Sequence, residues 1–169
     1  GTFRKVAEEG LPLFVGLRGD GLDELKGHIK AYREAWRQAG HDGYGSVFLR
    51  VPVYAAATEQ AAYDEPRECI IHYFERQARM IATVGAQGQG GEALRAKVAA
   101  ALNKLSYDDI RESRAAIGTP ERLIERFIEW RDVAGIDGAV MELNAGNLLG
   151  EEQISNSVRL IAEKVMPAF

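Results

Sequence analysis

The sequence has only one cysteine, Cys69, in 169 residues. A single cysteine cannot form an internal disulfide, which excludes the disulfide-stapled class of small secreted proteins and favours a cytoplasmic protein. We interpret Cys69 as a packed small apolar group rather than a nucleophile. Neither His28 nor His41 has the spacing to cysteines or carboxylates that a metal site requires, so we expect no metal.

Long apolar runs and clusters of one charge are also missing. No apolar run is long enough to cross a bilayer, and the first residues do not have the pattern of a secretory signal. A formal net charge of −4 without a basic stripe argues against nucleic-acid binding. The apolar fraction of 46% and charged fraction of 27% are typical of a globular protein. We therefore expect neither a nucleic acid nor a membrane as partner.

The last third of the chain, residues 115–169, predicts a helix, a strand and a second helix. Thr119 suits an N-cap, Pro120 the first helical position and Gly135 the end of that helix. An apolar strand over 136–143 follows, bounded by a turn at 144–146. The closing helix has acidic residues at its N-terminal end and an apolar side, made by Ile154, Val158, Ile161 and Val165.

Two further strands are expected, over 11–17 and 46–56. The first is apolar throughout, which predicts burial on both faces, as in parallel sheets. Residues 2–9 predict the end of a helix, and a longer helix between the strands has Asp20 as its expected N-cap and ends at Gly40. Its apolar stripe comprises Leu22, Leu25, Ile29, Tyr32 and Trp36.

Arg50 is the anomaly within the second of these strands. Alternation places Arg50, Pro52 and Tyr54 on one face, opposite a face suited to packing against helices, which carries Val47, Leu49, Val51 and Val53. An inward arginine would need an anionic partner. The alternatives are a pair with a core glutamate such as Glu142, or a side chain that reaches out at the lower rim. Pro52 also counts against an uninterrupted central strand, because proline cannot donate to a ladder.

Residues 58–114 are predicted to be mainly helical, with a restart at Pro66. The expected buried stripe comprises Ile70, Tyr73, Phe74, Gln77 and Ile81, and His72 lies off it, towards solvent. The glycine-rich run 85–91 has neither dinucleotide nor P-loop spacing, so we interpret about 85–114 as a flexible lid. Within it we expect a helix over 92–105 and a turn that starts at Asp108. Arg111 and Arg114 either close on an anionic ligand or form a solvated face.

The order of these motifs resembles the C-terminal end of the bacterial luciferase-like, flavin-dependent monooxygenases. The resemblance rests on residues 118–121, 134–137, 142–146 and 165–167, and on Thr2, Ala7, Gly10, Leu11 and Pro12. It implies an α/β fold, the C-terminal half of a (β/α)8 TIM barrel, because a whole barrel takes about 250 residues. We expect a single partial domain of three parallel strands with covering helices. Its exposed edges would be completed by a missing N-terminal half or by a second copy of the chain.

The resemblance also implies a function. Reduced FMN, supplied by a flavin reductase, would react with dioxygen and oxygenate a small organic substrate such as an aldehyde or a sulfonate. A sister branch of the family uses F420 and hydride transfer. The third possibility is a non-catalytic half barrel that dimerises and binds no flavin.

Thr2 is the cofactor contact that the resemblance implies, at a helix N-terminus that holds the flavin phosphate; the alternative is a plain N-cap. In the alkanesulfonate branch an arginine at the position of Arg50 contributes to the substrate pocket, but Pro52 stands where a histidine is expected, so sulfonate specificity does not carry over. TIM-barrel sites lie at the C-terminal ends of strands. The substrate-pocket candidates are Gly16, Arg50, Tyr54, Glu142 and Asn144, and we assign no catalytic base.

Overall fold

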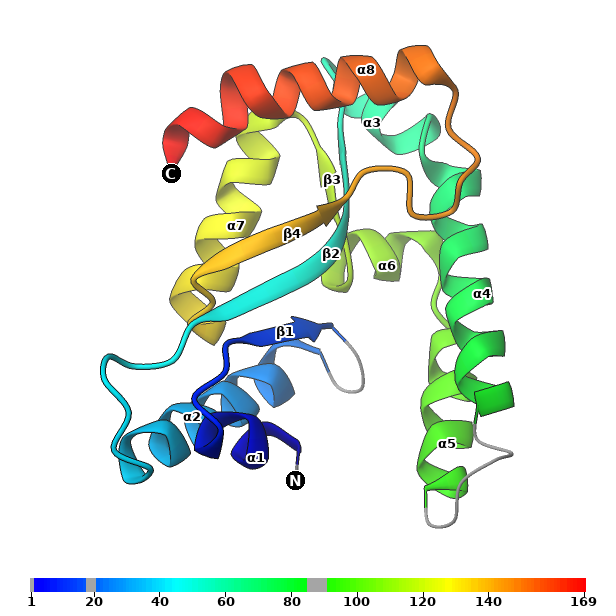
Figure 1. The fold of residues 1–169 in the computed structure, drawn as a ribbon. Coiled ribbons are helices and arrows are strands. Elements are labelled where there is room, and N and C mark those ends of the chain that lie inside the picture. The colour runs from blue at the N-terminus through cyan, green and yellow to red at the C-terminus, as the bar shows by residue number, and fades with distance from the viewer. Residues whose placement is uncertain (1, 18–20, 85–90) are drawn as a thin grey trace. The chain divides into compact units, whose positions relative to one another are not determined.

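The computed structural model of the chain describes residues 2–17, 21–84 and 91–169. The chain forms two compact units, Gly1–Val51 with Ile124–Met141, and Pro52–Leu123 with Glu142–Phe169. The elements follow in the order α1 (Thr2–Glu8), β1 (Leu13–Gly16), α2 (Leu22–Gln38), β2 (Val47–Ala55), α3 (Glu59–Asp64), α4 (Arg67–Val84), α5 (Glu92–Leu102), α6 (Tyr107–Ser113), β3 (Ala116–Gly118), α7 (Pro120–Ala134), β4 (Gly138–Glu142) and α8 (Glu151–Leu160) (Figure 1). A π-helical turn (Ile161–Val165) and a 3-10 turn (Met166–Ala168) complete the chain.

The sheet of the first unit has one packed face. Leu13 and Val15 of β1 are buried, whereas Phe14 between them is 64% exposed. The expectation that this strand is buried on both faces is therefore wrong, because only one of its faces is packed. The α1 and α2 helices of this unit lie side by side (Figure 1). The N-cap position of α2 is Gly21, with φ 90° and no side-chain cap, while the predicted cap Asp20 lies outside the described residues.

Strand β2 is the centre of the sheet, and it passes through Pro52 without a break. It pairs in parallel with β1 over residues 47–50 and with β3 over residues 53–55, and β4 also pairs with it. The expectation that Pro52 interrupts the strand is wrong. The physical reason is that Pro52 falls between these two registers, where neither β1 nor β3 needs its missing N–H.

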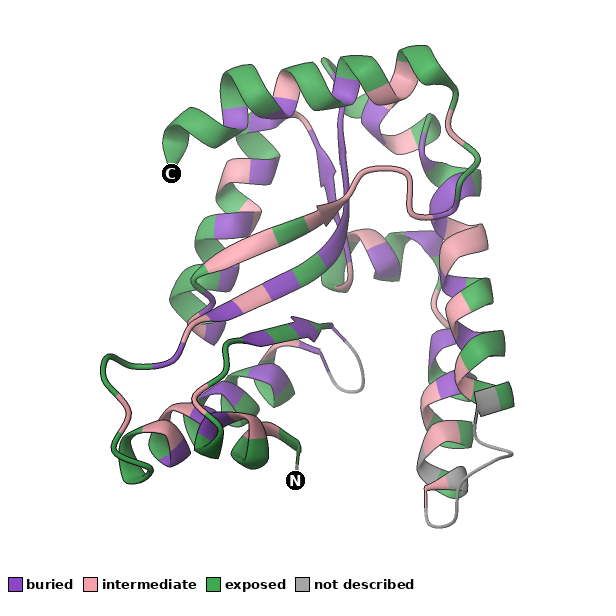
Figure 2. Ribbon diagram, viewed as in Figure 1, coloured by how far each residue is buried: buried purple, intermediate pink, exposed green. Residues whose placement is uncertain are grey.

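The predicted helix-facing side of β2 is confirmed. Val47, Leu49, Val51 and Val53 are all buried, and the strand is drawn largely as buried in Figure 2. Tyr54 and Pro52 on the other side are buried too, whereas Arg50 is exposed.

The second unit holds most of the helices and a strand that the sequence did not reveal. The α4 and α5 helices lie side by side (Figure 1), and residues of α3, α4, α5, α6 and β3 share one core. The three-residue strand β3 was missed because it is too short to show an alternating pattern. Helix α6 begins before the predicted Asp108, because Ser106 and Asp109 form a capping box at its start. Residues 85–90, most of the glycine-rich run, lie outside the described residues.

The predicted helix, strand and helix at the C-terminal end are confirmed. Thr119 accepts a 3.5 Å contact from the Arg122 N–H at the start of α7, and Gly135 ends that helix with φ 78°. The buried side of the last helix differs from the expectation. Ser157, Ile161 and Val165 are buried, whereas Val158 is 38% exposed, so the stripe is rotated towards Ser157. The Ser157 hydroxyl is buried because it accepts a 2.9 Å hydrogen bond from the Ala55 N–H at the end of β2.

The α/β class with a parallel sheet and covering helices is confirmed. Within the described parts of the chain, no helix combines the length and apolar character needed to span a bilayer.

Candidate functional site

The candidate residues fall into the two compact units. Thr2, Gly16 and Arg50 belong to the first unit, and Tyr54, Glu142 and Asn144 belong to the second. The alternative in which Arg50 pairs with Glu142 stays a prediction, because it would join different units.

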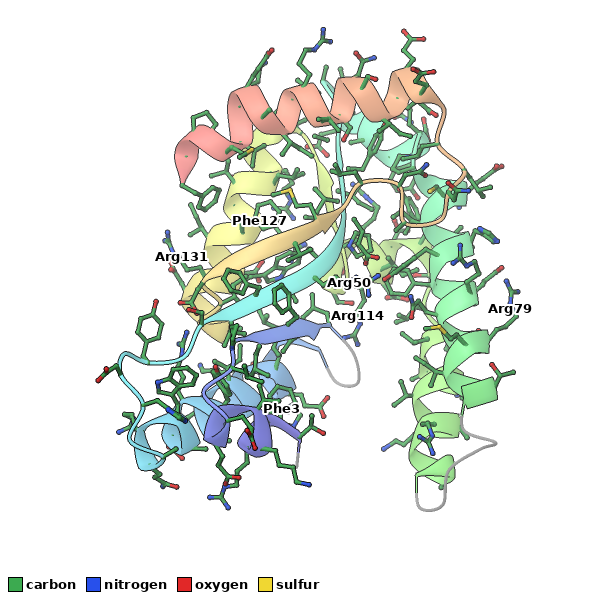
Figure 3. All side chains as sticks on the ribbon, viewed as in Figure 1. Phe3, Arg50, Arg79, Arg114, Phe127 and Arg131 are labelled. Carbon is green, nitrogen blue, oxygen red and sulfur yellow. The ribbon has the colours of Figure 1, made fainter. Side chains whose placement is uncertain are left out.

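In the first unit, β1 and β2 bring aromatic rings and a guanidinium to one face of the sheet. Phe14 pairs in register with Phe48, and Gly16 with Arg50. The two phenyl rings are stacked, with centroids 5.4 Å apart. Figure 3 labels Arg50, which is exposed on β2. Gly16, the register partner of Arg50, has no side chain.

Strand β4 extends the same face. Gly138 lies under the Phe48 ring, since a Cβ there would come within 3.1 Å of it, and Val140, two residues on, is 38% exposed. We call the surface formed by Phe14, Gly16, Phe48, Arg50 and Val140 the open sheet face. It combines the apolar side chains of Phe14, Phe48 and Val140 with the cation of Arg50.

Thr2 is the first residue of α1, where it is exposed. The helix is held against α2 by a stack of Phe3 on His28, with ring centroids 4.6 Å apart, and Figure 3 labels Phe3 on α1. The proposed contact of Thr2 with a flavin phosphate stays a prediction.

In the second unit, α4 holds the connection that follows β4. The Tyr73 hydroxyl donates a 2.7 Å hydrogen bond to Glu142, the last residue of β4. The Cys69 thiol donates to the Asn144 Oδ1 atom at 3.3 Å, and the Leu149 N–H donates to that same oxygen at 3.1 Å. Cys69 is packed, as predicted, with 2% exposure, but its thiol also makes this polar contact.

Gly146 closes this arrangement against the backbone of α4. A Cβ at Gly146 would lie 1.9 Å from the Cys69 carbonyl oxygen, so only glycine permits the approach. His72 Nδ1 lies 3.0 Å from the Gly146 carbonyl oxygen. Because a carbonyl only accepts, Nδ1 carries the proton. The expectation that His72 is solvated is wrong, since it is half-buried and engaged in this contact.

We call Cys69, His72 and Tyr73 the α4 clasp. They occupy positions i, i+3 and i+4 of one helix and therefore share a face, which is the signal that sequence analysis could have used. The apolar stripe predicted for this helix includes Tyr73, and burial periodicity gives no sign of the polar contact that its hydroxyl makes.

Tyr54, another predicted pocket residue, lies in the core with 2% exposure and donates its hydroxyl to Glu65. Burial raises the pKa of Tyr54, and the hydrogen bond and the charge of Glu65 raise it further. The phenol therefore stays protonated and serves as a donor.

Arg111 packs against aromatic rings. Its guanidinium carbon lies 4.7 Å from the Tyr63 ring centroid and 5.9 Å from that of Tyr107, and Arg67 lies over the same two rings. Burial raises the pKa of Tyr107 to about 12, partly offset by the nearby charge of Arg111. Of the two arginines predicted either to close on an anionic ligand or to form a solvated face, Arg111 is thus held by aromatic rings.

No group of three or more histidine, cysteine, aspartate or glutamate side chains with the arrangement of a metal site occurs in the described parts of the chain.

Comparison with known proteins places the chain in a family. The model of the luciferase-like monooxygenase family matches residues 2–137. A search of curated proteins gave no match. Solved structures show the same fold, although at low sequence identity.

Three of these structures are informative. The oxygenating constituent of 3,6-diketocamphane monooxygenase from Pseudomonas putida, in complex with FMN, is 22% identical, with a TM-score of 0.69. The match covers 99% of this chain and 45% of that protein. The coenzyme F420-dependent tetrahydromethanopterin reductase of Methanopyrus kandleri is 13% identical, with a TM-score of 0.62. The match covers 99% of this chain and 48% of the reductase. EDTA monooxygenase of Chelativorans sp. BNC1 is 16% identical, with a TM-score of 0.58. The match covers 98% of this chain and 43% of the monooxygenase.

The chain thus spans less than half the length of these structures, and its parallel sheet with covering helices corresponds to part of their TIM barrel. The family model covers most of the sequence, which is the stronger finding. The chain belongs to the luciferase-like monooxygenase family.

Proposed function

We propose that this chain forms the C-terminal part of a flavin-dependent monooxygenase that uses reduced FMN and dioxygen to oxygenate a small organic substrate, such as an aldehyde or a sulfonate. The observation that carries the proposal is the family match over residues 2–137. We also propose that Gly16 and Arg50 of the first unit and Glu142 and Asn144 of the second unit contact the substrate, and that Thr2 contacts the cofactor phosphate. Tyr54 is left out of this set, because it lies in the core with its hydroxyl on Glu65.

The open sheet face supports this proposal because its residues fit a flat ring with acidic groups. The stacked rings of Phe14 and Phe48 offer an apolar surface, and Arg50, the register partner of Gly16, offers a positive charge. When bound, the reduced flavin supplies the electrons that activate dioxygen. On the open sheet face the phenyl rings would exclude water from a bound ring, and Arg50 would orient an anionic group of cofactor or substrate.

An F420-dependent oxidoreductase is the second candidate. The observation that favours it is the fold likeness to the reductase of Methanopyrus kandleri, with TM-score 0.62, and F420, like FMN, carries acidic groups for which Arg50 is suited. The third candidate is a non-catalytic half barrel that dimerises and binds no flavin.

The proposed partners are a flavin reductase and an element that covers the open sheet face. Phe14 is 64% exposed and Val140 38% exposed, and apolar surfaces of this kind are normally covered. Either the complementary part of the barrel or a second copy of the chain would cover it. Intact mass and size-exclusion chromatography with light scattering separate these two, starting from the 18.6 kDa of the sequence.

The decisive experiment is a titration of the purified protein with FMN and with F420, followed by the visible spectrum and fluorescence. We expect saturable binding of FMN. The Arg50→Met variant should weaken it by about tenfold or more, because a hydrogen bond to a charged group contributes about 1.5–3 kcal/mol. Arg37→Met is the matched control, since Arg37 is exposed in the last turn of α2. Binding of F420 alone would support the second candidate, and binding of neither would support the non-catalytic one.

A further inference from the structure

The side-chain amide of Asn144 has a defined orientation. Its Oδ1 atom accepts two hydrogen bonds, from the Leu149 N–H at 3.1 Å and from the Cys69 thiol at 3.3 Å. A backbone N–H can only donate, so the atom that faces it must be the amide oxygen rather than the nitrogen. The Nδ2 group, with its two N–H donors, therefore points away from both partners.

These two donors are not used inside the described parts of the chain. No hydrogen bond of Nδ2 occurs there, and Nδ2 is not among the buried unpaired nitrogens. Asn144 as a whole is half-buried, so its nitrogen is within reach of a ligand. An N–H group that is held in place by other bonds of the same side chain loses little freedom when it binds.

The surroundings keep this amide rigid. Gly146 packs directly on the Cys69 backbone, and the Asn147 N–H donates to the Asn144 carbonyl oxygen at 3.0 Å. Asn144 also follows Glu142 by two residues at the carboxyl end of β4, where ligands of parallel α/β sheets bind.

We propose that Asn144 is a preset hydrogen-bond donor that selects ligands carrying an acceptor oxygen, such as a carbonyl, sulfonate or carboxylate. The inference deepens the proposed function and rests on it, because it names the chemical class that the pocket recognises. Ligands that offer only donors at this position leave the amide N–H groups unpaired and bind more weakly.

The Asn144→Asp variant tests this, because aspartate has nearly the same shape. One carboxylate oxygen can still accept from Leu149 and Cys69, while the other replaces the donating nitrogen with an acceptor. The variant therefore keeps the loop closed, removes the donor and adds one negative charge. Asn156→Asp is the matched control, because it makes the same change of charge on α8 at an exposed residue.

The probes are hexan-2-one, hexane-1-sulfonate and hexylammonium, which share one tail and differ in the head group. Binding is followed by NMR of the 15N-labelled protein, in which the side-chain amide of Asn144 is identified by its loss in Asn144→Asp. The neutral ketone is the deciding probe, because an added negative charge would repel the sulfonate even without contact.

We expect the ketone and the sulfonate to shift the Asn144 amide signals. The Asn144→Asp substitution should weaken the binding of the ketone by about 3- to 10-fold. Hexylammonium should bind Asn144→Asp at least as well as the wild type, and Asn156→Asp should behave as the wild type. Ketone binding that is equal in wild type and Asn144→Asp would overturn the inference, as would amide signals that do not move or the absence of saturable probe binding. A parallel FMN titration of the wild type keeps the two proposals apart. If FMN binds but the probes do not behave as expected, this inference alone is rejected. If FMN does not bind to the wild type, the proposed function is rejected.

Discussion

Substitution of Gly146 by alanine is expected to be among the most damaging small changes in the second unit. The new Cβ would lie 1.9 Å from the Cys69 carbonyl oxygen and 2.7 Å from the carbonyl carbon. The two backbone segments must separate by about 1.1 Å before the first distance reaches 3.0 Å. Both partners are main-chain atoms, so no side-chain rotation can relieve the overlap.

The cost follows from what that separation disturbs. Overpacking of a closely packed contact costs about 1–3 kcal/mol. The same movement strains the His72 contact to Gly146 and the Cys69 contact to Asn144, each of the kind that contributes about 0.5–1.5 kcal/mol. We therefore expect a loss of about 2–6 kcal/mol in the free energy of unfolding.

The assay is urea denaturation followed by circular dichroism, with hydrogen exchange of the Leu149 N–H as a local probe. That N–H donates to Asn144, so its protection should fall in Gly146→Ala. Gly27→Ala is the matched control, because Gly27 lies inside α2 with nothing within 4 Å of an added Cβ. Alanine there should stabilise the protein by about 0.5–1 kcal/mol. The reasoning is refuted if Gly146→Ala is as stable as the wild type.

Two further predictions concern Asp137 and Tyr107. Asp137→Ala should destabilise the protein by about 2–4 kcal/mol in urea denaturation, because its carboxylate accepts from Arg33 at 3.0 Å and from the Val47 N–H at 2.7 Å. Asp132→Ala is the control, because among the described residues this exposed carboxylate pairs with its sequence neighbour Arg131 alone. It should change stability by less than about 1 kcal/mol, and equal losses in the two variants would contradict the prediction. Because burial raises the pKa of Tyr107 from 10.0 to about 12, the folded state holds that proton longer than the unfolded state, so its contribution is complete below pH 10 and is lost as the pH rises to about 12. The free energy of unfolding should fall over this range, with a smaller slope in Tyr107→Phe, and an unchanged slope in that variant would reject the assignment.

Local patterns predicted the elements better than the contacts between them. Thr119, Pro120 and Gly135 located α7 to within a residue, because capping and chain termination depend on neighbours in sequence. The alternation of valine and leucine in β2 identified its packed face for the same reason. Strand β3 escaped notice because a three-residue strand depends on pairing with β2 and not on its own pattern.

The candidate site divides in the same way. The sequence and its resemblance to a family pointed to Glu142 and Asn144, since both follow a predicted strand. The α4 clasp was missed, because Cys69, His72 and Tyr73 contact residues about 70 positions later in the chain. The burial of Tyr54 on Glu65 was missed too, because a hydroxyl's partner cannot be inferred from alternation.

By itself the sequence therefore determined the α/β class, the start and end of α7, the packed face of β2 and the family. These depend on residue type and on spacing along the chain. Only the tertiary structure decided that Pro52 falls between two strand registers, that Phe14 is exposed, and that the oxygen of Asn144 is engaged while its nitrogen faces outward. Each of these results depends on which distant segment lies alongside, and spacing along the chain carries no information about that.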